Sequence, residues 1–237
     1  MQSQASLPLL RPLLLQFPAD KPARSVSDQW LLGDGLMVAP AGIGSTTGKA
    51  DTMSRDVYFP GSKISWYDYW SGKLVAAGPK TVRSMPTPVS HAPVFVRGGA
   101  ILPLVVDPTA LKPAARSLRL LAAMTVEETG TASGTLFLDD GEALDTSGAN
   151  KHLLVNFTLG DRQLSSKPVS GQLGGFAPTF PSVVSRCTIL GVKVGVTSLL
   201  FNGKKLPKAD CTLKGGVLQV VGLSASVGEP WTLQWTI

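Results

Sequence analysis

Apolar residues in this chain fall in short runs that polar or turn-forming residues interrupt every few positions. The runs at 57–59, 64–70, 118–125, 134–138 and 153–159 are rich in β-branched, aromatic or alternating apolar residues. Short runs of this kind, bounded by turns, predict β-strands and argue against long helices. The 25 glycines and 18 prolines among 237 residues supply the interruptions. We therefore expect a mainly β fold of the sandwich type.

Three segments indicate how some of these strands are arranged. Residues 231–237 alternate apolar and polar with period two, so their odd-numbered residues should share one buried face. Asn202-Gly203 lies between two apolar runs and predicts a hairpin, because both residues tolerate positive φ. Gly98-Gly99 lies between the runs 94–97 and 100–104, which we expect to form a second hairpin.

The first forty residues show a different pattern, with consecutive apolar residues. Residues 7–17, which contain Leu13-Leu14-Leu15, and the run Leu36-Met37-Val38-Ala39 predict strands buried on both faces, as in a parallel sheet or barrel. Two such strands alone have unpaired edges. We therefore expect residues 1–40 to be the least stable part of the isolated chain and to require a packing partner.

Charge and hydropathy exclude two classes of partner. The net charge is +6, but the basic residues are scattered, and the longest basic run is Lys204-Lys205. This distribution indicates that the charge contributes to solubility, and we expect no nucleic-acid binding. No stretch reaches the ~18 consecutive apolar residues of a membrane span. Arg11, between Pro8 and Pro12, also interrupts the apolar N-terminal segment, so we expect neither a signal peptide nor membrane insertion.

The cysteines and histidines indicate no metal site. Cys187, Cys211, His91 and His152 are far apart in sequence and lack metal-ligand spacing. The two cysteines form either a disulfide between neighbouring strands or two buried thiols. The glycine-rich segment 171–175 opens no helix and is not a phosphate loop. We therefore expect no metal and no cofactor.

Two groups of polar residues resemble catalytic arrangements. Asp139-Asp140, with Glu142 nearby, suggests a carboxylate dyad or a calcium loop. Adjacent residues at a strand end point to opposite sides, however, and the further acids of a calcium loop are absent, so we interpret this segment as a turn. His91 with Ser90 or Asp68 could form a triad, but the chain has no nucleophile elbow. We assign no catalytic residue to this chain.

The aromatic cluster at 66–70 is the candidate ligand site. It contains Trp66, Tyr67, Tyr69 and Trp70, and flat aromatic faces suit the apolar faces of pyranose rings. Strand alternation would place Trp66 and Trp70 on one side and the two tyrosines on the other. One side must be core, so the cluster is either a packing element or a sugar platform. Trp66 and Trp70 are the candidate sugar contacts.

The order of several short motifs resembles a known family. Arg11-Pro12-Leu13 and Asp28-Gln29-Trp30 come first, followed by the cluster at 66–72, the segment 93–103 and Leu136-Phe137-Leu138-Asp139-Asp140-Gly141. The series is similar to the C-terminal part of glycoside hydrolase family 31, the α-glucosidase family. The resemblance implies the last fragment of a (β/α)8 barrel at 1–45. It also implies two consecutive antiparallel β-sandwich domains, a proximal one at 46–112 and a distal one at 113–237.

The same resemblance implies a function for the parent protein. Members of this family cleave α-glucosidic bonds in maltose-like, starch-like or N-glycan substrates with two carboxylates, and both lie upstream of these motifs. The family's Trp-x-Asp-Met-Asn-Glu nucleophile motif is absent here. The resemblance therefore implies an inactive C-terminal region that braces a catalytic barrel, in the same chain or in a separate subunit, and meets α-glucan or glycan substrate through that barrel. The alternatives are a stand-alone carbohydrate-binding module and a subunit of a split α-glucosidase.

Overall fold

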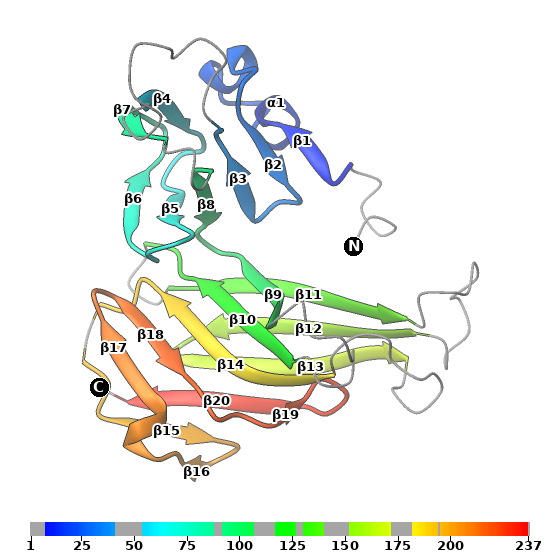
Figure 1. Cartoon of the computed structure of the whole chain (residues 1–237). Helices are drawn as coiled ribbons and strands as arrows, with labels where there is room; N and C mark the ends of the chain where they lie inside the picture. The colour runs from blue at the N-terminus through cyan, green and yellow to red at the C-terminus, as the bar shows by residue number, and fades with distance from the viewer. Residues whose placement is uncertain are drawn as a thin grey trace. The chain divides into compact units, whose positions relative to one another are not determined.

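The computed structural model shows a mainly β protein made of two compact units (Figure 1). It describes residues 8–40, 54–87, 92–106, 117–126, 130–139, 152–171, 182–193 and 195–236. The chain divides after Ala100, so that one unit precedes this residue and the other begins at Ile101. Among the described residues, no helix is long and apolar enough to cross a membrane.

The first unit contains a six-stranded sheet and a separate strand pair. The sheet has the order β1-β2-β3-β8-β5-β6, and β4 pairs with β7. A short helix, α1 (Leu13–Gln16), and a 3-10 turn, η1 (Pro22–Ser25), follow the first strand. The strands are β1 (Leu10–Pro12), β2 (Trp30–Leu32), β3 (Leu36–Val38), β4 (Ser54–Phe59), β5 (Ser65–Asp68), β6 (Leu74–Ala77), β7 (Lys80–Pro86) and β8 (Val94–Arg97).

The expectation of two N-terminal strands buried on both faces is wrong. Strand β1 ends at Pro12, and Leu13 begins α1 instead of continuing the strand. Leu13 is buried, whereas Leu14 and Leu15, on the outer side of this single turn, are exposed. Strand β3 pairs antiparallel with both β2 and β8, and only its central residue, Met37, is fully buried. Pro12 ends the first strand before the leucine run. The second run lies in an antiparallel sheet and not in the parallel sheet or barrel that we expected.

Residues from the first forty positions form part of the core of the first unit. Leu13, Leu31 and Met37 are fully buried and pack in one cluster with Phe59 and Phe95. Because β1, β2 and β3 share a sheet with β5 and β8, this segment has packing partners within the unit. The described residues of this segment therefore have the packing partners that we expected them to lack, whereas their lower stability relative to the rest of the chain stays a prediction. The boundaries 1–45, 46–112 and 113–237 themselves stay a prediction.

The second unit is built from two sheets that enclose one core. One sheet has the order β17-β18-β14-β10-β9, with β19 paired to β14, and the other has the order β11-β12-β13-β20-β15-β16. The strands are β9 (Ile101–Val106), β10 (Ser117–Ala123), β11 (Ala132–Asp139), β12 (His152–Gly160), β13 (Gln163–Gly171), β14 (Val183–Leu190), β15 (Ser198–Phe201), β16 (Lys204–Lys205), β17 (Cys211–Lys214), β18 (Val217–Val220), β19 (Ala225–Ser226) and β20 (Trp231–Thr236).

Two expectations about strand pairing are corrected here. The runs flanking Gly98-Gly99 do not pair as a hairpin, because β8 belongs to the first unit's sheet and β9 pairs with β10. In addition, β10 and β14 run parallel, whereas we expected antiparallel sheets throughout. Parallel pairing requires a long connection between the two strands, and β11, β12 and β13 lie in that connection.

Other local expectations are confirmed. Asn202 and Gly203 have φ of 48° and 77° and connect β15 to β16, as expected for a two-residue hairpin. In β20 the odd-numbered residues Trp231, Leu233 and Trp235 are buried. The pattern at 231–236 therefore determined both the strand and its buried face.

The cysteines are free thiols on strands that are not neighbours. Cys187 on β14 and Cys211 on β17 are both register partners of Val220, on the intervening strand β18. Two strand spacings separate their backbones by about 9–10 Å, more than the ~7 Å limit between the Cα atoms of a disulfide. Of the two alternatives, the structure therefore has unpaired thiols, with Cys187 fully buried and Cys211 partly buried.

Candidate functional site

Gln29, from one of the recognised motifs, has a structural role in the first unit. Its side chain is buried, and its amide group pairs with the backbone of Tyr58 on β4. The Gln29 Nε2 donates to the Tyr58 carbonyl at 2.8 Å, and the Tyr58 N–H donates to Oε1 at 2.8 Å. The side chain therefore satisfies two backbone groups of β4, as a neighbouring strand would.

Asp20 makes a second polar link to the same strand pair. The Tyr58 hydroxyl donates to Asp20 Oδ1 at 2.6 Å, and the Gly61 N–H donates to Oδ2 at 2.9 Å. Burial and the neighbouring carboxylate together raise the pKa of Tyr58 well above its usual range. The phenol therefore stays protonated and continues to donate to Asp20.

Arg55 connects three segments of the first unit. Its guanidinium forms an ion pair with the Asp28 carboxylate and donates from Nη1 to the Asp28 carbonyl at 3.0 Å and to the Pro40 carbonyl at 2.7 Å. These contacts hold the end of β3 and the loop before β2 against β4. Asp28 and Asp20 thus have structural partners, as expected for residues that maintain a fold.

Trp66 and Trp70, the two predicted sugar contacts, lie in different environments. Strand β5 contains a register shift between Trp66 and Tyr67, so both of these consecutive residues are buried. Trp66 is 0% exposed, its Nε1 donates to the Pro60 carbonyl at 3.0 Å, and its ring lies 6.3 Å from that of Phe17. The expectation that the two tryptophans share one side is therefore wrong, and Trp66 has no open face for a ligand.

Trp70 remains as the candidate contact, with 55% of its surface exposed. It follows β5 in a turn in which the Gly72 N–H donates to the Asp68 carbonyl at 2.8 Å. The indole Nε1 donates to the Ala92 carbonyl at 3.0 Å, and the indole ring is perpendicular to the Tyr69 ring at a centroid distance of 5.1 Å. These contacts orient an exposed indole ring at the surface of the first unit.

A cavity of about 350 Å³ lies beside Trp70. Its apolar lining includes Leu74 and the buried Phe95, while Asp68 and Lys73 provide charged groups. Concave sites that combine apolar walls with a few polar groups are typical of small-ligand binding.

A larger cavity of about 670 Å³ lies elsewhere in the first unit, lined by Phe17, Lys21 and Arg97 among others. The Arg97 guanidinium lies 5.5 Å from the Phe17 ring centroid, at cation–π distance. Burial lowers the pKa of Arg97, and the nearby Asp34 partly opposes this effect. The charge of Arg97 is therefore already partnered by Phe17 and Asp34, which indicates a packing role.

The remaining predicted residues form no catalytic group in the part of the chain that is described. His152 stacks on Phe137 at 5.6 Å and lies 3.3 Å from the Ser170 hydroxyl. Asp139 is the last residue of β11, whereas Asp140, Glu142, Ser90 and His91 lie outside the described residues. No cluster of three or more His, Cys, Asp or Glu residues able to hold a metal occurs among the described positions.

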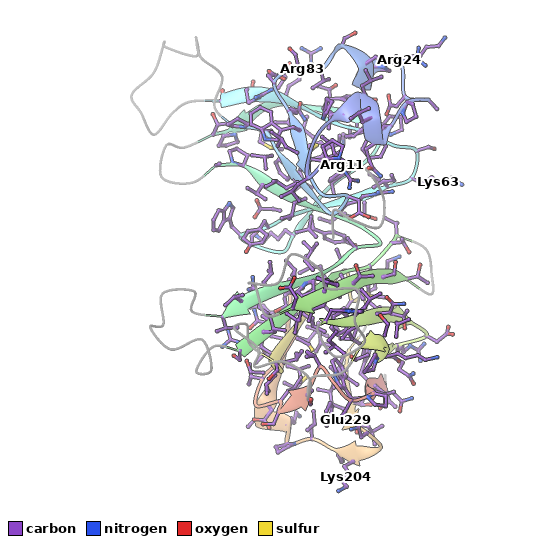
Figure 2. All side chains as sticks on the ribbon, turned by 90° about the vertical axis from the view of Figure 1, so that its right-hand side faces the viewer. Arg11, Arg24, Lys63, Arg83, Lys204 and Glu229 are labelled. Carbon is purple, nitrogen blue, oxygen red and sulfur yellow. The ribbon has the colours of Figure 1, made fainter. Side chains whose placement is uncertain are left out.

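Basic side chains are distributed over both units. Figure 2 shows Arg24, Lys63 and Arg83 on the first unit and Lys204 on the second, all of them exposed. Arg24 donates to the Pro18 carbonyl, which anchors it locally in the 3-10 turn.

Comparison with known proteins identifies the family. Residues 6–102 match the model of the glycosyl hydrolase family 31 C-terminal domain. Residues 6–102 therefore belong to the C-terminal domain of glycoside hydrolase family 31. The chain is 29% identical over 241 residues to neutral alpha-glucosidase C from Mus musculus. This alignment covers 97% of the chain and 25% of the relative. The chain is also 30% identical over 234 residues to an alpha-glucosidase from Aspergillus oryzae, and this alignment covers 96% of the chain and 22% of the relative.

Solved structures of family 31 enzymes share the fold. A glucosidase II alpha subunit superposes with a TM-score of 0.74 at 19% identity, covering 98% of this chain and 26% of that one. A Flavobacterium johnsoniae GH31 dextranase superposes with the same TM-score of 0.74 at 20% identity, covering 100% of this chain and 30% of that one. The chain spans about a quarter of the length of the curated relatives that it matches.

Proposed function

We propose that this chain is the C-terminal β-sandwich region of a family 31 hydrolase of the α-glucosidase type, and that it supports a catalytic (β/α)8 barrel. Hydrolysis by a retaining glycosidase requires two carboxyl groups about 5–5.5 Å apart across the scissile bond. The carboxylates of Asp20, Asp28 and Asp68 are instead engaged in structural contacts. These roles favour a supporting region over a catalytic one.

The observation that carries this proposal is an exposed apolar surface at the start of the first unit. Leu10 on β1 is 55% exposed, and its register partner on β2, Leu32, is also exposed. Leu9, which precedes Leu10, and Leu14 and Leu15 of α1 are exposed as well. We call these five residues the leucine surface. An apolar surface of this kind normally marks an interface, because burial of each half-exposed leucine contributes roughly half of the ~1.5–3 kcal/mol that complete burial of the side chain provides.

The occupant that we propose for the leucine surface is the catalytic barrel, in the same polypeptide or as a separate subunit. The relatives are about four times as long as this chain, so they contain ample sequence for such a domain. In this arrangement α-glucan or glycan substrate is bound and cleaved by the barrel. The alternative of a split α-glucosidase differs only in whether the barrel is covalently attached.

Size-exclusion chromatography with a dye that binds apolar surfaces tests this proposal. We expect the wild-type chain to self-associate and to bind the dye, and the double variant Leu10→Ser/Leu15→Ser to elute as a monomer with less bound dye. Val169→Ser, at an exposed valine of the second unit, is the matched control and should behave like the wild type. A monomeric wild type whose dye binding equals that of the double variant would show that the surface needs no partner.

A further inference from the structure

The surface around Trp70 combines exposed apolar side chains with a cavity. Trp70 is 55% exposed although tryptophan is usually largely buried, and Leu74, four residues later, is also exposed. Both line the cavity of about 350 Å³ whose inner wall includes the buried Phe95. Two exposed apolar side chains therefore lie at the rim of a hollow that is large enough for a small ligand.

The indole ring is held in a fixed orientation before any ligand arrives. The contacts of Nε1 with the Ala92 carbonyl and of the ring with Tyr69 restrain it from two directions. The turn that carries it is itself fixed, because the Ser71 N–H and hydroxyl both donate to Asp68 Oδ1, and the Asp68 N–H donates to the Lys73 carbonyl. A ring fixed in this way loses little conformational entropy when a ligand stacks on it.

The charges at the cavity indicate a neutral ligand. Asp68 and Lys73 carry opposite charges and both line the cavity, so these two side chains together contribute no net charge to it. A charged ligand would gain little from such a pair. A ligand with many hydroxyl groups can instead donate to the carboxylate and accept from the ammonium group, and it can present the apolar face of its ring to Trp70.

We propose that the Trp70 cavity is a carbohydrate-binding site that holds one neutral pyranose unit, stacked on the indole of Trp70, with Asp68, Ser71 and Lys73 contacting its hydroxyl groups. None of the residues of the leucine surface lines this cavity. One stacked ring with a few hydrogen bonds gives a weak site, with a dissociation constant on the order of 1 mM.

Calorimetry and saturation-transfer NMR on the full chain with maltotriose as the probe test this site. We expect saturable binding, with the strongest saturation on the ring C–H protons of one terminal sugar. Trp70→Phe keeps an aromatic ring and should bind within about tenfold of the wild type, a difference of up to about 1.4 kcal/mol. Trp70→Ala should lose saturable binding.

Controls make the test specific to the cavity. Leu10→Ala, at an exposed leucine outside it, should bind maltotriose like the wild type, and a thermal melt of each variant verifies that it is folded. Absence of saturable binding by the folded wild type would overturn the proposal, as would equal binding by Trp70→Ala. Concentration-dependent dimerisation that Trp70→Ala abolishes would also overturn it, because the cavity would then be a protein interface.

Discussion

Two tryptophans four residues apart have opposite roles in this chain. Trp66 is enclosed by Phe17 and Phe59 and donates a buried hydrogen bond, whereas Trp70 lies at the surface. We expect Trp66→Ala to lower the free energy of unfolding by about 3–5 kcal/mol, through lost burial and a cavity. Trp70→Ala should cost less than about 1 kcal/mol. Urea unfolding followed by fluorescence measures both, and equal costs would contradict the assignment of Trp66 to the core.

Cys187 is expected to lower the free energy of unfolding as the pH rises into the alkaline range. Burial raises the pKa of its thiol to about 12, above the value of about 8.5 in an unfolded chain. The folded-state pKa is the higher one, so the stabilising contribution is complete below pH 8.5 and is lost as pH rises toward 12. Over that range the unfolded chain binds fewer protons than the folded one, and the free energy of unfolding falls by up to about 1.4 kcal/mol per pH unit.

Substitution of Cys187 tests this dependence. Cys187→Ala should flatten the decline of stability between pH 9 and pH 11 that thermal melts record, whatever the cost of the substitution at neutral pH. Cys211→Ala is the matched control and should flatten it less, because Cys211 is only partly buried. Identical slopes for Cys187→Ala and the wild type would show that the thiol ionises freely in the folded chain.

The sequence identified the aromatic cluster at 66–70 but did not predict correctly which of its side chains are buried. The aromatic cluster was recognisable, but the alternation rule assumed that the strand continues from 64 to 70. The register shift after Trp66 and the turn that starts at Asp68 end the alternation. The register shift lies in the pairing of β5 with β6, and β5 also pairs with β8. Both partner strands lie outside residues 66–70, so no periodicity within that run indicates these features.

Among the elements, β4 depends on a side chain in place of a second strand neighbour. We expect Gln29→Leu to destabilise the chain by about 2 kcal/mol or more, because both the N–H and the carbonyl of Tyr58 lose their partner. Gln219→Leu, at an exposed position of β18, makes the same chemical change without loss of a buried bond and is the control. A Gln29 variant as stable as the Gln219 variant would show that water replaces the lost bonds.

Gly134 on β11 lies directly against the backbone of Ile101, the first residue of β9. A Cβ atom placed there would lie 2.0 Å from the Ile101 carbonyl oxygen, so even alanine forces β11 and β9 apart. Gly134→Ala should cost about 1–3 kcal/mol, the usual penalty of overpacking, and lower the melting temperature. At Gly160 the nearest atom would be 3.8 Å away, so Gly160→Ala should melt like the wild type. Equal melting of both variants would show that the sheets adjust freely.

Individual strands and turns could be predicted from the sequence, but the pairing of distant strands could not. The alternating run at 231–236 and the turn at Asn202-Gly203 carry their structure in a few consecutive residues, and both were predictable. The glycines at 98–99 resemble a hairpin turn, yet β9 pairs with β10, and β10 pairs in parallel with β14 more than sixty residues away. Long-range pairing of this kind depends on how the whole core is buried and leaves no local signal.

On the scale of the whole molecule, the resemblance of short motifs predicted the family, and the physical roles of those motifs explain why. Gln29, Asp28 and Trp66 hold the first unit together, so their order along the chain reports the fold. The integration of residues 8–40 into the first unit's sheet was not predictable, because it depends on pairing between β3 and β8. The leucine surface could be anticipated only as a run of apolar residues in need of a partner.

Turnover of 4-nitrophenyl α-glucoside by the purified chain distinguishes a supporting region from a catalytic one. If the chain only supports a catalytic barrel, the rate should equal that of a heat-denatured sample across every chromatographic fraction, because such a chain would lack the acid–base pair that performs the chemical step. Activity that co-elutes with the 24.9 kDa chain and is lost in Asp139→Asn or another single carboxylate variant would contradict the account.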